Sequence, residues 1–251
     1  MRIFSPCGDA DGVAAAAADD FVELARRAIR ERGRFTVALS GGTTPRGLYR
    51  LLAEERRGEV EWEHVEIFWG DERAVPPDHP ESNYGLAARE LLDHVPVRSE
   101  HVHRIHGEHP DGDAAARAYQ TVIARVFRAP ETAFPPPFDL VLLGLGADGH
   151  TASLFAGSPG LAERRRWVVC HHVAALGVTR FTLTVPVLVR AREIRVMVTG
   201  ADKAETLRAV LQGRRDPQRL PIQAVRPMLG RMAWLVDDDA AGRLRAAGVT
   251  A

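Results

Sequence analysis

The chain has 251 residues, of which 45% are hydrophobic and 26% are charged, as is typical of a folded globular protein. Its 33 basic and 33 acidic residues balance, so no net field favours nucleic acid or an anionic membrane as a partner. No linker or repeat divides the chain, and we expect residues 1–251 to form a single domain.

Nothing in the sequence indicates a membrane or an oxidising compartment. Cys7 and Cys170 are too few for a disulfide framework. The N-terminal segment turns acidic within nine residues and lacks the apolar core of a signal peptide. No apolar segment approaches the roughly 20 residues that a membrane span needs. We therefore expect a cytoplasmic protein.

The N-terminal part of the chain predicts alternating helices and strands. Residues 10–31 place apolar side chains at helical spacing, and residues 35–39 form a short apolar run typical of a buried strand. A helix over residues 46–53 follows, with Pro45 in its first turn. Residues 65–69 predict the next strand.

The loop between the first strand and the second helix is a candidate anion site. It contains Ser40, Gly41, Gly42 and Thr43, so hydroxyl groups meet the free N–H groups and the dipole of a helix N-terminus. The Walker pattern GxxxxGK[ST] is absent. A tight turn with a threonine cap is the alternative, and phosphate binding is the interpretation we favour.

A charged cluster follows the strand at residues 65–69. Asp71, Glu72 and Arg73 fit a solvated turn with a local ion pair, which is common. In a parallel sheet, however, they stand at the same edge as the Ser40 loop, where a catalytic or substrate-binding role is plausible. A helix over residues 82–92 follows, with Ser82 near its N-cap.

Four histidines between residues 101 and 109 raise the possibility of a metal site. His101, His103, His106 and His109 have neither helical-pair spacing nor a zinc-knuckle spacing, and no cysteine is near. We therefore expect no metal site. Residues 113–127 then predict a further helix.

The stretch at residues 138–155 carries the strongest functional signal. An apolar run over residues 138–143 predicts a strand buried on both faces. A turn with three glycines follows it, and this turn carries Asp148 and His150. An open α/β sheet binds its ligand at the carboxyl ends of such strands, and an imidazole titrates near neutral pH.

The same turn contains a literal GxGxxG pattern at residues 144–149, which is typical of dinucleotide-binding proteins. Such a site needs an acidic residue about 20 positions later to hold the ribose. Residues 164–175 contain no acidic residue, so we do not expect a nicotinamide or flavin cofactor.

The C-terminal half continues the alternation. The predicted strands are residues 167–171, 180–185, 194–199 and 232–236, and the predicted helices are residues 202–211 and 237–247. The pattern predicts an α/β fold with three layers: a mostly parallel, open, Rossmann-like sheet with helices on both faces.

Lys203 is the only lysine among the 33 basic residues. A position that keeps lysine in an arginine-rich chain favours a compact, flexible ammonium group. Lys203 falls in the first turn of a predicted helix, where the dipole disfavours a cation, so a bound anion would explain it. A chance surface lysine is the alternative.

Five blocks of sequence resemble the 6-phosphogluconolactonase family, within a superfamily that includes glucosamine-6-phosphate deaminases. The blocks are residues 40–49, 69–85, 138–155, 180–188 and 198–211. The resemblance runs nearly end to end. It implies hydrolysis of 6-phosphoglucono-δ-lactone to 6-phosphogluconate in the oxidative pentose phosphate pathway, without metal or cofactor.

The residues fit that chemistry. His150 is the expected general base on water, oriented by Asp148 or another carboxylate. Asp71 and Arg73 are expected to meet the sugar hydroxyls and the lactone oxygen. The other expected ligands of the substrate and its phosphate are Ser40, Gly41, Gly42, Thr43, Asn83, Arg180 and Lys203.

Two other functions are alternatives for this chain. Deaminases of the superfamily carry a glutamate five residues after the histidine and an aromatic residue after the Asp-Glu pair, where this chain has Phe155 and Arg73. A non-catalytic sugar-phosphate sensor would need a DNA-binding module, which is not visible. The expected partner is therefore a small sugar-phosphate lactone, bound by a monomer or small homo-oligomer.

Overall fold

The computed structural model describes residues 2–228 and 230–244. The strands are β1 (Arg2–Pro6), β2 (Phe35–Leu39), β3 (Val65–Trp69), β4 (Asp71–Arg73), β5 (Leu140–Gly144), β6 (Val168–Val173), β7 (Val178–Leu183), β8 (Glu193–Val198) and β9 (Arg231–Val236). The helices are α1 (Ala10–Arg32), α2 (Thr43–Glu54), α3 (Asn83–Glu90), α4 (Gly112–Phe127), α5 (Pro159–Ala162), α6 (Val185–Leu188), α7 (Ala204–Gln212) and α8 (Asp238–Ala241).

A parallel sheet forms the centre of the molecule. Within the described residues it has six strands in the order β1-β9-β8-β5-β2-β3, and every neighbouring pair is parallel. The side chains of β2 and β8 are buried along their whole lengths, as expected for strands covered on both faces. The predicted α/β class is confirmed.

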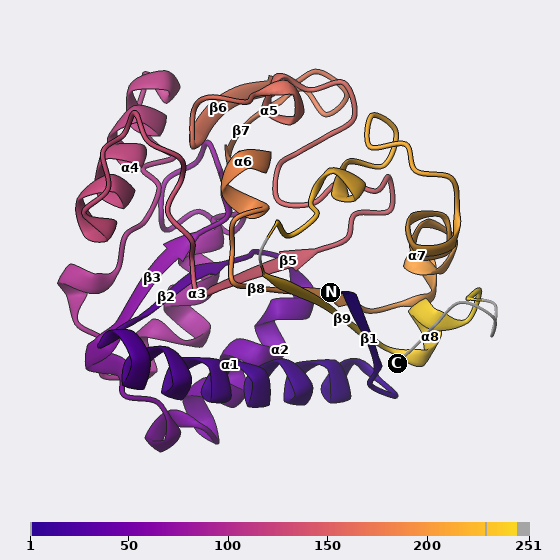
Figure 1. Ribbon diagram of the computed structural model, residues 1–251, viewed down its shortest axis with the longest axis horizontal. Helices are drawn as coiled ribbons and strands as arrows, with labels where there is room; N and C mark the ends of the chain where they lie inside the picture. Colours follow the sequence, from indigo (N-terminus) through magenta and orange to yellow (C-terminus); the bar gives the residue numbers. More distant parts are fainter. Residues whose placement is uncertain (1, 229, 245–251) are drawn as a thin grey trace.

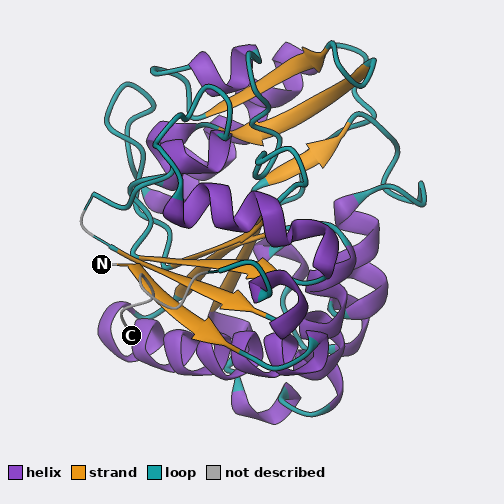
Figure 2. Ribbon diagram, turned by 90° about the vertical axis from the view of Figure 1, so that its right-hand side faces the viewer, coloured by secondary structure: helices purple, strands orange, loops and turns teal. Residues whose placement is uncertain are grey.

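Helices α1 and α2 pack together on one face of this sheet, below it in Figure 1. Helix α4 and a second, smaller sheet lie on the other side (Figures 1 and 2). The predicted layers with helices on both faces are therefore present. Among the described residues, no helix is long and apolar enough to cross a membrane.

The direction of the chain through the sheet reverses between β2 and β5. From β2 the chain moves outward to β3, whereas from β5 it moves the opposite way to β8 and then β9. The loops that follow β2 and β5 therefore diverge and leave a crevice at the carboxyl ends of the strands. Ligands of open α/β sheets bind at such a reversal.

The second sheet was not expected. Strands β4, β7 and β6 form an antiparallel sheet in that order, so two of the predicted strands do not join the central sheet. A tight turn over residues 174–177, with Gly177 in the left-handed region at φ 64°, joins β6 to β7 as a hairpin. A connection this short cannot place two strands in parallel.

Several other predicted elements differ in detail from those observed. Strand β1 was missed, and it pairs with β9 at the sheet edge. Helix α3 ends at Glu90 instead of residue 92. The predicted helix over residues 237–247 is too long: α8 spans only Asp238–Ala241, residues 242–244 are not helical, and residues 245–247 lie outside the described part of the chain.

Asp139 fixes β5 against β2 at the start of the central strand. Its buried carboxylate accepts hydrogen bonds from the Thr36 backbone N–H at 2.9 Å and from the Thr36 hydroxyl at 2.8 Å. Its other oxygen accepts from Nε of Arg32 at 3.0 Å. The register that positions the loops after β2 and β5 thus depends partly on one carboxylate.

We expect Asp139→Ala to lower the free energy of unfolding by about 3 kcal/mol, because it leaves buried donors without an acceptor. Urea denaturation followed by circular dichroism measures this change. Asp113→Ala is the matched control: Asp113 is 58% exposed and pairs with Arg166 at 3.4 Å, so its removal should have little effect. Equal effects for the two variants would contradict the role given to Asp139.

Candidate active site

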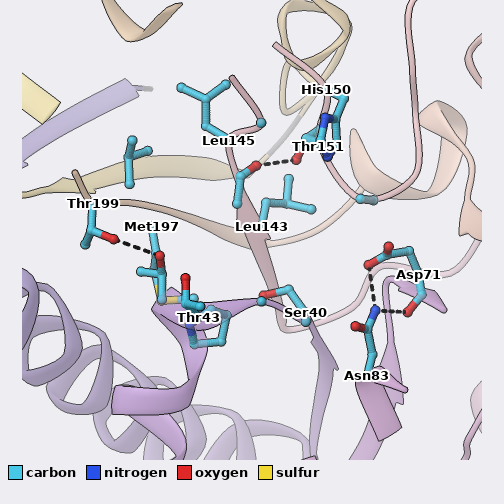
Figure 3. Close-up of a pocket in the computed structure, with 18 of the residues that line it drawn as sticks. Ser40, Thr43, Asp71, Asn83, Leu143, Leu145, His150, Thr151, Met197 and Thr199 are labelled. Carbon is cyan, nitrogen blue, oxygen red and sulfur yellow. Dashed lines mark hydrogen bonds between the residues drawn. The ribbon is translucent and has the colours of Figure 1, made fainter. Parts of the chain in front are cut away.

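A pocket of about 220 Å³ lies at the carboxyl ends of β2, β5 and β8, where the chain reverses (Figure 3). Nine of the eleven residues predicted to form the site line it: Ser40, Gly41, Gly42, Thr43, Asp71, Arg73, Asn83, His150 and Lys203. The two that do not are Asp148 and Arg180. Parallel strands thus bring together residues that lie more than 160 positions apart.

The loop after β2 presents donors to the pocket. Gly42 is the N-cap of α2 at φ 105° and ψ −179°, a conformation open essentially to glycine alone. It has no side chain with which to cap the helix. The first N–H groups of α2 are therefore available to an anion, and the helix dipole favours one there.

Ser40 adds a hydroxyl to this loop. Its carbonyl accepts a hydrogen bond from Tyr49 at 2.6 Å, which holds the residue in place. Its Oγ is buried and has no hydrogen-bond partner in the described chain. A buried hydroxyl without a partner is unusual, and in a pocket wall it is consistent with a group that binds a ligand.

Asn83 connects the loop after β2 to the loop after β3. Its Nδ2 donates to the Asp71 backbone carbonyl at 2.9 Å and to Asp71 Oδ1 at 3.4 Å (Figure 3). A Cβ added at Gly41 would lie 1.7 Å from Asn83 Oδ1. Asn83 can approach this closely only because residue 41 has no side chain. This requirement for glycine is separate from any contact of Gly41 with a ligand.

Glu72 turns away from the pocket and holds the start of α3. Its buried carboxylate accepts from the backbone N–H groups of Arg73, Asn83 and Tyr84, each at 2.8 Å. Burial raises the pKa of Glu72, and these N–H groups partly offset that effect. The alternative of a solvated turn is thus wrong for Glu72, because the cluster becomes strand β4.

Asp148 orients His150. The Nδ1 atom of His150 lies 2.5 Å from Asp148 Oδ1, and the same oxygen accepts from the His150 backbone N–H at 3.1 Å. Burial opposes ionisation of Asp148, but the backbone N–H and the imidazole outweigh it and hold the pKa of Asp148 below its ordinary value. An ionised acceptor at Nδ1 leaves Nε2 of a neutral imidazole free to accept a proton.

Phe155 packs on the other side of the imidazole. The two ring centroids are 4.3 Å apart and the rings are stacked, with 28° between their planes. The position where deaminases carry a glutamate therefore holds an apolar ring in direct contact with His150. His150 is fixed by Asp148 at one edge and by Phe155 at one face.

Lys203 reaches the pocket from the start of α7. It ends a short 3₁₀ helix (Ala201–Lys203) and is the N-cap residue of α7. Its Nζ lies 2.7 Å from Asp202, a residue whose side chain is 67% exposed. Exposed ion pairs of this kind contribute little, so an anion in the pocket can compete for the ammonium group.

Arg180 lies beside Arg73 on the neighbouring strand and does not line the pocket. The two arginines are register partners on the antiparallel strands β4 and β7. Partial burial, together with the charge of Arg73, lowers the pKa of the Arg180 guanidinium. Arg73 Nη1 donates to the Glu81 carbonyl. These two adjacent positive charges repel each other, and an anion bound at the pocket edge would reduce the repulsion.

Two of the four histidines make hydrogen-bonding contacts within the protein, at His103 and His109. His103 is buried, contacts Glu66 at 2.7 Å and lies 4.6 Å from the ring of Phe68. His109 Nδ1 accepts from the Asp111 N–H at 3.0 Å. Among the described residues, no group of three or more histidine, cysteine or acidic side chains is placed to hold a metal ion.

Sequence reasoning missed several residues of the site. Thr44 and Thr199 join the loops after β2 and β8 by a hydroxyl contact of 2.9 Å, and Thr151 Oγ1 donates to the Gly144 carbonyl at 2.8 Å (Figure 3). Ser153 donates to Asp71. The hydroxyl residues around the glycine-rich turns were the available signal, but only the fold assigns them partners.

Comparison with known proteins identifies relatives of this chain. Residues 8–234 match the family described as glucosamine-6-phosphate isomerases/6-phosphogluconolactonase. The chain belongs to this family. It is 40% identical over 219 residues to a 6-phosphogluconolactonase of Synechocystis sp., covering 87% of this chain and 88% of the relative. It is 38% identical over 243 residues to that of Mycobacterium tuberculosis, covering 94% and 96%.

Solved structures of family members superpose closely. The 6-phosphogluconolactonase of Trypanosoma cruzi has a TM-score of 0.85 at 30% identity, with 98% of each chain covered. A monomeric glucosamine-6-phosphate deaminase has a TM-score of 0.78 at 20% identity, with 96% of this chain and 99% of the other covered. The second likeness shows the shared fold alone.

We expect Gly41→Ala to lower the free energy of unfolding by about 2 kcal/mol, because the new methyl group overlaps the Asn83 amide. Urea denaturation measures this change in the free energy of unfolding. Gly58→Ala is the control, since an added Cβ there has no atom within 4 Å. A Gly41→Ala variant as stable as the control would contradict the close approach of Asn83.

Proposed function

We propose that the protein hydrolyses 6-phospho-D-glucono-1,5-lactone to 6-phospho-D-gluconate. The observation that carries the proposal is the Asp148–His150 pair facing, across one pocket, an uncapped helix N-terminus and the single lysine. A base at one end and an anion site at the other suit a phosphorylated substrate with a reactive carbonyl. The 6-phosphogluconolactonases among the relatives support the same assignment.

The 6-phosphate is assigned to the end of the pocket formed by the loop after β2. The N–H groups of the first turn of α2 and the Ser40 hydroxyl supply hydrogen bonds, and Lys203 supplies the charge. Thr43 lines this end as well. Arg180 lies further away, so its role in holding the phosphate stays a prediction and would act beside Arg73.

The lactone carbonyl is assigned to the end formed by the loop after β5. His150 accepts a proton from water through Nε2, the hydroxide forms a bond to the carbonyl carbon, and the ring C–O bond then breaks. The protonated imidazole returns the proton to the leaving oxygen. Asp148 holds the imidazole throughout and stabilises its charged form.

Asp71 and Arg73 are assigned to the sugar. Asp71 is held by Asn83 and Ser153, and its remaining acceptor sites suit sugar hydroxyls. Arg73 supplies positive charge at the pocket edge for the oxygen that becomes negative as water attacks. A lactone is already electrophilic, so positioning and charge stabilisation are sufficient without a metal or cofactor.

The metabolic pathway in which the protein acts is inferred only from the proposed reaction. A phospholactonase of this specificity would serve the oxidative pentose phosphate pathway. Location in the cytoplasm, a single domain and a monomeric or small oligomeric state stay predictions.

Acid release from freshly generated 6-phosphoglucono-δ-lactone tests the proposal. We expect the protein to hydrolyse the lactone faster than the spontaneous rate. Addition of EDTA should not change the rate of the catalysed reaction. Ammonia release from glucosamine 6-phosphate is the contrasting assay. Activity there and none on the lactone would overturn the proposal, and would mean that Phe155 does not exclude the deaminase reaction.

We expect His150→Ala to lower kcat by about 10²- to 10⁴-fold, the range typical of a lost general base. Lys203→Ala should instead raise KM about tenfold, because a charged hydrogen bond to the phosphate is lost. Steady-state kinetics separate the two effects. Full turnover in His150→Ala would refute the base assignment.

We expect Asp148→Asn to lower kcat about a hundredfold, because an amide no longer favours the tautomer with a free Nε2. An ordinary aspartate titrates at about pH 4, and the pKa of Asp148 is lower than that. Asp148 therefore becomes protonated, and stops accepting the hydrogen bond from His150, only below about pH 4. A pH profile of kcat above pH 5 should therefore show no contribution from Asp148. A variant with wild-type kcat would contradict the positioning role.

A further inference from the structure

Ser153 is a buried residue that does not line the pocket and contacts it only through Asp71. It belongs to the turn that carries His150, and its side chain is not part of the pocket wall. Its Oγ donates to Asp71 Oδ2 at 2.8 Å, and the residue is 1% exposed. Ser153 therefore contacts a pocket residue from behind.

The small antiparallel sheet in turn holds Ser153. The Ser153 N–H donates to Thr182 Oγ1 on β7 at 3.3 Å, and the Ser153 carbonyl contacts Nε2 of His171 on β6 at 2.9 Å. Thr182 is the register partner of Asp71 on β4. All three strands of this sheet thus converge on the Ser153–Asp71 contact.

His171 supports Ser153 from a buried position on β6. It is buried, and burial lowers its pKa. A neutral imidazole that donates from Nε2 to a carbonyl has one defined tautomer. The ring also fills the space beside Gly160, where an added Cβ would lie 2.7 Å from Nε2.

The backbone between His150 and Ser153 is strained. Ala152 has φ 46°, in the left-handed region that costs a non-glycine residue about 1–2 kcal/mol. This conformation lets Thr151 line the pocket while Ser153 turns toward Asp71. Strain of this kind persists where the surroundings fix it, and it is common at functional sites.

We propose that Ser153 is a positioning residue for Asp71, supported by the antiparallel sheet; this inference rests on the proposed function. The 2.8 Å contact is the shorter of the two side-chain hydrogen bonds to the Asp71 carboxylate, the other being 3.4 Å from Asn83. It fixes the rotation of the carboxylate and leaves its other acceptor sites to the sugar. Ser153 sets the orientation of the lactone ring relative to His150 without touching the substrate.

Kinetics of a double-mutant cycle test this role. We expect Ser153→Ala to lower kcat for the lactone about tenfold and to change KM less than twofold, because the phosphate ligands are untouched. In an Asp71→Asn background, the same substitution should change kcat less than twofold, since residues that act as a unit are not additive. Thermal unfolding of each variant accompanies the kinetics.

Two further variants make the cycle decisive. Thr184→Val removes another buried hydroxyl, one that donates to the Arg166 carbonyl at 2.7 Å, and should leave kcat unchanged. Thr182→Val removes the acceptor for the Ser153 N–H and should lower kcat two- to fivefold, which tests the platform if Ser153→Ala does not fold.

A wild-type kcat in Ser153→Ala, or an effect that is fully additive with Asp71→Asn, would overturn the inference while the lactonase activity stands. Equal losses in Thr184→Val and Ser153→Ala would overturn it as well, because they would indicate general destabilisation. A wild-type protein without lactonase activity would overturn the proposed function, and this role with it.

Discussion

The site depends on one topological constraint, the reversal of the chain between β2 and β5. Because neighbouring parallel strands end at the same edge, their loops compete for space there, and only at a reversal do they diverge. The divergence leaves backbone N–H groups of the loop after β2 facing the imidazole of the loop after β5. Asp139 keeps the two strands in register through Thr36. The distance between the two ends of the pocket is therefore fixed by the sheet.

The pocket is built from polar groups that the protein itself leaves unsatisfied. The Ser40 hydroxyl and the Asn83 carbonyl oxygen are buried without partners in the described chain, and no side chain caps α2. Adjacent cations at Arg73 and Arg180 oppose each other. Such arrangements cost stability, and a bound anion would reduce the repulsion between the cations and accept from the free donors. The Ser40 hydroxyl and the uncapped start of α2 on one pocket wall are the physical argument that an anion binds there.

The small antiparallel sheet changes how the active site is supported. Strand β4 carries Asp71 at its start and Arg73 at its end, so the pocket spans two sheets. Glu72, between them, faces the opposite way and binds the N-terminus of α3. The alternation of side chains along three residues of strand thus places two groups toward the substrate and one toward the fold. A solvated turn could not impose that alternation.

Much of this protein was readable from the sequence, because its signals are local. Apolar runs that end in glycine-rich loops predicted the parallel strands and the edge at which they meet, and nine of the predicted site residues line one pocket. Most partners of those residues were not readable, the contact of Asp148 with His150 two positions away being the exception. The hydrogen bond from Ser153 to Asp71 spans 82 positions, and the contact of Phe155 with His150 depends on the turn conformation. The hairpin of β6 and β7, the register of β4 and the exclusion of Arg180 from the pocket wall arise from pairing between distant segments. Residue types and periodicity determined where polar and titratable groups follow the buried strands, and only tertiary packing decided which side chains hold those groups in place.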